Sequence, residues 1–179
     1  MSNNLFARLD DYIQKNSQEQ ISFLQSLIRA NSANPFTPEK SIPEKPIERE
    51  VAYGLRDKLL EIGLRPELKG VSPHRPNVVA VLKGETDGRS LILNGHMDTV
   101  MPSQQSETDP FAGIIKNKRL YGLGALDMKA SLAVFVFAAK ALLQCRVKLR
   151  GDLILTFVVD EEPGACSRFG TNYLLRNGL

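Results

Sequence analysis

The sequence predicts an α/β fold in which helices flank a mixed, mostly parallel sheet. Apolar stripes at helical spacing alternate along the chain with short apolar runs of strand length. The run 153–159 is apolar almost throughout, as in a strand that is covered on both faces. This alternation favours a sheet with helices packed on its faces, and 179 residues suffice for a domain with its own core.

Three apolar stripes predict helices in the first third of the chain. The first two run over 5–13 and 21–28, and the Asn34-Pro35 pair ends their pattern. The third covers 47–62, begins after Pro46 and reaches Gly63, a residue type common just beyond helix C-termini. The intervening segment 35–46 is expected to be an ordered loop.

Short apolar runs predict the strands of the sheet. The runs 77–82 and 91–93 are joined by 84–89, whose Asp-Gly pair favours a tight reversal, so we expect these two strands to be antiparallel neighbours. Residues 114–121 predict a small hairpin that turns at 117–118.

Two further helices are expected in the second half of the chain. The segment 127–145 is rich in alanine and apolar almost all round, which predicts a helix buried against the sheet. A last helix is expected over 170–177, closed by Gly178. Lys129 could neutralise the acidic residues nearby, but it is interpreted as a surface lysine of this helix.

Composition argues against several classes of protein. The formal charge is +3, and the basic residues do not form the stripe expected of a nucleic-acid-binding protein. The longest apolar stretch, 132–139, is far shorter than the ~20 residues that cross a bilayer. Two cysteines and an N-terminus without a secretory profile predict a reducing, cytoplasmic location. We therefore expect no nucleic-acid or membrane partner.

A histidine and an aspartate alternate at the end of the second predicted strand. Residues two apart in an extended chain project to the same face, so His96 and Asp98 are expected to lie together. A metal-bound imidazole usually donates its other N–H to a carboxylate or carbonyl, which would make His96 the ligand and Asp98 its orienting partner. The alternative is a plain hydrogen-bonded pair at a strand end.

Two acidic patches complete the set of candidate residues. Asp127 opens the buried helix, where it could bridge two cations or simply cap the helix. Glu161 and Glu162 follow Asp160 at the end of an apolar strand. One of the two glutamates could bind a metal while the other moves a proton, or the three acids could form an exposed turn.

The patterns at 95–100, 109–130 and 160–164 resemble the motifs of one family of cocatalytic zinc hydrolases, which contains the aminoacylases, acetylornithine deacetylases, succinyl-diaminopimelate desuccinylases and carboxypeptidase G. The resemblance implies His96 as a ligand of one zinc, Asp127 as a bridge between two, and Glu162 as a ligand of the other. It also implies Glu161 as general base and Asp98 as the residue that orients His96.

The resemblance carries further expectations about the fold and the cofactor. It implies a zinc-exopeptidase-like catalytic domain with two Zn²⁺ ions per complete site, and Co²⁺ or Mn²⁺ as alternatives. The peptide bond after Asp127 is expected to be cis. Leu123 departs from the pattern, because many members carry arginine between the two glycines.

The implied function is hydrolysis of the amide bond of an N-acyl amino acid or small peptide. Residues 1–179 are interpreted as the N-terminal portion of the catalytic domain, without the family's lid domain, a further acidic ligand and a final zinc-binding histidine. A homodimer is therefore expected only of a full-length protein, and the isolated chain is expected to bind metal poorly and to be inactive. The alternatives are a non-catalytic binding or vestigial module and a simple cation-binding domain.

Overall fold

The computed structural model describes residues 2–35, 47–103, 108–162 and 169–178, so most of the predicted loop 35–46 lies outside the described residues. The helices of these segments are α1 (Ser2–Lys15), α2 (Ser17–Arg29), α3 (Arg49–Glu61), α4 (Lys129–Gln144) and α5 (Thr171–Asn177). The strands are β1 (Glu67–Lys69), β2 (Asn77–Leu82), β3 (Leu91–His96), β4 (Ile114–Lys116), β5 (Arg119–Tyr121) and β6 (Leu153–Val158).

The main sheet has four strands in the order β1-β2-β6-β3. The predicted mixed sheet is confirmed, but among the described strands β3 and β6 alone are parallel, so the expectation of a mostly parallel sheet is wrong for this part of the chain. Strands β3 and β6 are parallel because α4 lies between them in the sequence and serves as their crossover.

The prediction that β2 and β3 are neighbours is wrong, because β6 lies between them. The connection after β2 passes the start of β6 closely: a Cβ added at Gly84 would lie 2.5 Å from the carbonyl carbon of Gly151. Strand β6 is buried on nearly its whole length, and the central position between two partners provides that burial. Local turn chemistry was thus overridden by burial of the most apolar strand.

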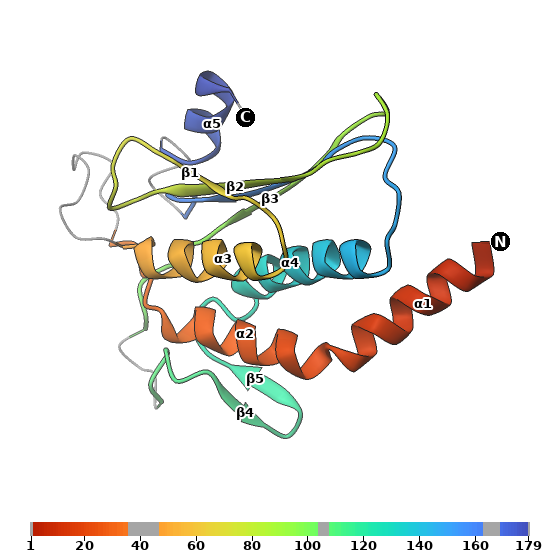
Figure 1. Ribbon diagram of the computed structural model, residues 1–179. Coiled ribbons are helices and arrows are strands. Elements are labelled where there is room, and N and C mark those ends of the chain that lie inside the picture. The colour runs from red at the N-terminus through yellow and green to blue at the C-terminus, as the bar shows by residue number, and fades with distance from the viewer. Residues whose placement is uncertain (1, 36–46, 104–107, 163–168, 179) are drawn as a thin grey trace.

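Helices cover the two faces of the sheet, as Figure 1 shows, with α3 and α4 on one face and α5 on the other. Alternate strand residues serve the two faces: Val78 and Leu155 belong to the main core, whereas Val79 and Val158 pack with Leu174 of α5. This alternation places β3 and β6 against α4, so the ends of both strands meet the start of that helix.

The smaller predicted elements are confirmed. Strands β4 and β5 pair as an antiparallel hairpin, and its turn residues Asn117 and Lys118 have φ of 52° and 60°. Two consecutive positive φ values are typical of the type I′ turn that suits a two-residue hairpin loop. Gly63 follows α3 with φ of 93°, the left-handed conformation common after a helix. Within the described residues, no helix combines the length and the hydropathy needed to cross a bilayer.

Candidate metal centre

The end of β3 places His96 and Asp98 as the sequence predicts. His96 is 6% exposed and Asp98 is fully buried. The imidazole Nδ1 lies 3.0 Å from the Asp98 carbonyl oxygen and 3.6 Å from its carboxylate Oδ1. The other ring nitrogen, Nε2, lies 3.0 Å from Asp127 Oδ1. Because Asp98 occupies the Nδ1 side of the ring, Nε2 is the nitrogen that faces the acidic residues.

Asp127 does not cap α4. The residue at the N-cap position is Met128, which makes no capping side-chain hydrogen bond, and the Asp127–Met128 peptide bond is cis, as the resemblance implies. The Asp127 side chain is 77% exposed and its carboxylate contacts the imidazole of His96. The turn before α4 therefore presents this carboxylate to the end of β3 and not to the helix backbone.

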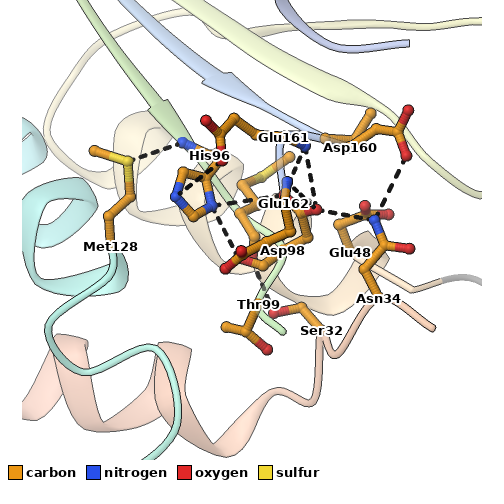
Figure 2. Close-up of polar contacts among 12 residues, drawn as sticks. Ser32, Asn34, Glu48, His96, Asp98, Thr99, Met128, Asp160, Glu161 and Glu162 are labelled. Atoms are coloured by element: carbon orange, nitrogen blue, oxygen red, sulfur yellow. Dashed lines mark hydrogen bonds and ion pairs between the residues drawn. The ribbon is translucent and has the colours of Figure 1, made fainter. Parts of the chain in front are cut away.

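The acidic residues after β6 have three different environments (Figure 2). Asp160 is buried and has a φ of 64°, which turns the chain at the strand end. Glu162 is also buried, and its Oε1 accepts a hydrogen bond from the backbone N–H of Val100 at 3.1 Å. Only Glu161 is exposed, so the alternative of an exposed acidic turn is wrong for the other two. Glu161 Oε2 lies 3.6 Å from His96 Nε2.

The carboxylate of Asp98 also holds the backbone of the acidic turn. It accepts hydrogen bonds from the backbone N–H groups of Glu161 and Glu162, each at 3.2 Å, and from the Asn34 amide at 2.9 Å. Figure 2 shows Asp98 between the imidazole and this turn. One buried carboxylate thus connects the end of β3 to the end of β6, which sets the positions of His96 and both glutamates together.

The charges of the cluster shift the pKa values of its members. Burial alone would lower the pKa of His96, but hydrogen bonds and the charge of Asp98, with a contribution from Asp127, raise it to about 9. Burial acts to raise the pKa of Asp98, yet hydrogen bonds from His96, Asn34 and the two backbone N–H groups hold it below its usual value. Burial raises the pKa of Glu162, and the neighbouring carboxylates add to this effect. The group is rich in carboxylates and suited to a cation.

Three of the predicted residues form a group that could hold a metal ion. One donor atom from each of His96, Asp127 and Glu162 lies within 4.8 Å of the others. Zinc bonds nitrogen and oxygen ligands at about 2.0–2.2 Å, and catalytic zinc sites commonly use three protein ligands and water. Small side-chain adjustments would bring these donors around one ion, so the residues present fit the implied metal.

Comparisons with known proteins identify the family. The model of peptidase family M20/M25/M40 matches residues 92–179, which include every candidate site residue. The chain belongs to this family. It is 36% identical over 157 residues to an N-formyl-4-amino-5-aminomethyl-2-methylpyrimidine deformylase of Halalkalibacterium halodurans, covering 86% of this chain and 35% of that protein. The predicted family resemblance is thereby confirmed.

Two further similar proteins extend the comparison. The chain is 34% identical over 149 residues to a succinyl-diaminopimelate desuccinylase of Ralstonia nicotianae, covering 81% of this chain and 37% of the relative. Its fold matches a dinuclear metal-binding M20 peptidase of Bacillus subtilis, YXEP, with a TM-score of 0.62 at 21% identity, over 91% of this chain and 39% of that one. The chain thus spans little more than a third of each of these relatives.

A buried polar network behind the candidate metal centre was not predicted from the sequence. Arg75 forms an ion pair with Glu48 and lies 3.3 Å from Asp160, and all three side chains are nearly inaccessible. Asn34 joins this group to Asp98, since its amide lies 2.9 Å from Asp98 and 3.5 Å from Asp160 (Figure 2). Of these residues only Asp160 belongs to a sequence motif, and nothing in the sequence marks Arg75 or Glu48, because their burial depends on partners from distant segments.

The interpretation of Lys129 as a surface residue is wrong. Its side chain is fully buried at the start of α4, and burial lowers its pKa to about 8. The ammonium donates hydrogen bonds to the carbonyl oxygens of Leu27 and Ala30, each at 2.8 Å. A lysine in the first turn of a helix gives no sign in the sequence that it will be enclosed by another helix.

Zinc binding is expected to tighten as the pH rises towards about 9. Imidazole binds zinc only when neutral, and His96 in the metal-free protein has a pKa of about 9, so zinc must displace a proton at lower pH. Each pH unit below that pKa should lower the apparent zinc affinity by about tenfold. Calorimetric titration in buffers of different ionisation enthalpy, between about pH 6 and 8, measures the proton release. A pH-independent affinity without proton release would contradict this prediction.

Proposed function

We propose that this sequence serves the metal-dependent hydrolysis of an amide bond in an N-acyl amino acid or small peptide. The observation that carries the proposal is the convergence of His96, Asp127 and Glu162, whose donor atoms lie within 4.8 Å of one another beside the exposed carboxylate of Glu161. The structurally similar YXEP protein of Bacillus subtilis is a dinuclear metal-binding peptidase, which supports the same kind of centre here.

The chain's own residues suit separate roles in such a reaction. In the proposed dinuclear centre His96, Asp127 and Glu162 would hold the zinc, and the bound metal would lower the pKa of water and polarise the substrate carbonyl. Glu161 is exposed and close to the same imidazole, so it can take a proton from the attacking water and return it to the leaving amine. Asp98 orients His96 and holds the backbone of both glutamates.

The names of the relatives support an N-acyl amine as the substrate class. One is a deformylase and another a desuccinylase, and both names denote removal of an acyl group from nitrogen. Hydrolysis of either kind of amide needs the same two functions, a polarised carbonyl and a base that moves one proton. The size and charge of the acyl group are a separate question that a substrate panel answers.

The proposal is tested by metal titration together with an assay of amide hydrolysis. Three protein donors are the usual number for one catalytic zinc, so the 179-residue chain is expected to bind one zinc and not two, more weakly than a complete dinuclear site would. Glu162→Gln should weaken zinc binding at least ~100-fold. Loss of a residue that only hydrogen-bonds to a metal ligand typically weakens it ~10–100-fold. Hydrolysis of N-formyl, N-acetyl and N-succinyl amines and of dipeptides is assayed with a complete, zinc-loaded enzyme that contains this sequence. Absence of zinc binding would favour the alternative of a non-catalytic α/β module.

The setting of this activity is also part of the proposal. A small-molecule substrate, no nucleic-acid or membrane partner and a cytoplasmic location are supported by the dispersed charge and the two cysteines. Homodimer formation of a full-length protein is proposed from the family resemblance alone. The assignment of residues 1–179 to the N-terminal portion of a metallohydrolase catalytic domain stays a prediction.

A further inference from the structure

Lys129 follows the proposed ligand Asp127 by two residues, and its ammonium is buried. Its Nζ donates to the carbonyls of Leu27 and Ala30, and within the described chain it forms no ion pair with a carboxylate. Burying a charge without a counter-charge is unfavourable, so a contribution to stability does not by itself account for a lysine here.

Both acceptors of the ammonium lie at the C-terminal end of α2. The last carbonyls of a helix lack intrahelical partners and carry the negative end of the helix dipole, which makes them good acceptors for a cation. Because Lys129 is the first residue of α4, its side chain attaches the start of α4 to the end of α2.

From Ala30 the chain continues beside the strand end that carries the imidazole. The Thr99 N–H donates to the Ser32 carbonyl at 3.0 Å, and the Asn34 N–H donates to the Thr99 carbonyl at 2.8 Å. The Ser32 hydroxyl adds a bond of 2.7 Å to the carbonyl of Met97. The segment attached to Lys129 at one end therefore holds 97–99, immediately after His96, at the other.

The backbone of Lys129 borders the turn that carries Asp127. Its N–H donates to the Gly124 carbonyl at 2.9 Å. Gly124 has a φ of 73°, and a Cβ added there would lie 2.6 Å from Thr99 Cγ2 and 3.3 Å from Lys129 Cδ. The turn is thus enclosed between the lysine stem and the residues that follow His96, so displacement of the lysine would move Asp127 relative to the imidazole.

We propose that Lys129 is a positioning residue of the metal centre. Its ammonium joins the start of α4 to the end of α2, and this connection sets the separation between the Asp127 carboxylate and His96 Nε2, which is 3.0 Å. The inference rests on the proposed metal site and adds to it a residue that touches neither substrate nor metal.

Lys140 provides a matched control on the same helix. It also reaches from α4 to α2, where its Nζ lies 2.5 Å from Glu19 Oε2. At 1.5 Å per residue, its helix position is about 16 Å beyond that of Lys129. Lys129→Met and Lys140→Met each remove the lysine contacts that join α4 to the α2 segment, but only Lys129 borders the turn that carries a proposed ligand.

Lys129→Met is expected to lower zinc affinity about 10–100-fold, the usual effect of losing an outer partner of a metal ligand. The visible absorption bands of the cobalt-loaded protein should also change, because they report ligand geometry. Lys140→Met should leave both the affinity and the bands as in the wild type, whatever its thermal stability. Unchanged zinc affinity and cobalt bands in a folded Lys129→Met variant would overturn the inference.

A double-mutant cycle tests the route of the connection. Ser32→Ala removes the hydrogen bond to Met97 on the same route, so its effect on zinc affinity should be non-additive with Lys129→Met and additive with Lys140→Met. If Lys129→Met does not fold, normal zinc affinity in Ser32→Ala alone would overturn the inference. Failure of the wild-type chain to bind zinc would overturn the proposed centre itself, which is a different result.

Discussion

In a complete enzyme that contains this sequence, replacement of Glu161 by glutamine is expected to lower turnover by ~10²–10⁴-fold, the usual loss when a general base is removed. Glutamine has nearly the same shape as glutamate but cannot accept a proton from water. The side chain of Glu161 is half-exposed and 3.6 Å from His96 Nε2, whereas Glu162 is buried and lies within the donor group. Zinc affinity should therefore stay near the wild-type value in Glu161→Gln.

The matched variant is Glu162→Gln, which changes the neighbouring residue in the same way. It should lose metal first, and activity only as a consequence of metal loss. Zinc content by elemental analysis and turnover at saturating zinc are measured for both variants. Equal zinc loss in the two would show that the roles of Glu161 and Glu162 are wrongly assigned.

Replacement of Arg75 by methionine is expected to destabilise the protein by ~3–5 kcal/mol, the range for removing one partner of a buried ion pair. Arg75 pairs with Glu48 and Asp160, and the exposed fractions of the three side chains are 4% or less. Without the guanidinium, both carboxylates would remain buried beside Asp98. Burial already raises the pKa of Glu48 despite the hydrogen bond from Arg75, so loss of Arg75 should leave Glu48 protonated.

Arg56→Met is the control for this prediction. Arg56 pairs with Asp57, but both side chains are substantially exposed, and exposed pairs contribute about 0–1 kcal/mol. The free energy of unfolding is measured by urea denaturation for both variants and for Arg75→Met combined with Glu48→Leu. The double variant should recover part of the loss, because one unpaired buried charge is removed with its partner. A loss in Arg75→Met no larger than in Arg56→Met would contradict the prediction.

The local elements, and the three residues that the structure groups as possible metal ligands, were predictable from the sequence. Apolar spacing indicated the five helices α1 to α5 and the strands β2, β3 and β6, because burial of one face imposes the period of a helix or strand. The His96, Asp127 and Glu162 patches were found because each follows or opens such an element and matches a family motif. The structure brings these three residues together.

Strand order and the support of the site were decided by the tertiary structure. The Asp-Gly turn after β2 favoured pairing with β3, but burial of β6 between them prevailed. The sequence does not mark Lys129 or Arg75 for burial, because their partners are 102 and 27 positions away. The local sequence pattern indicates which face of a helix or strand is apolar. Whether a charged side chain is buried depends on which distant carbonyls and carboxylates the fold brings to it.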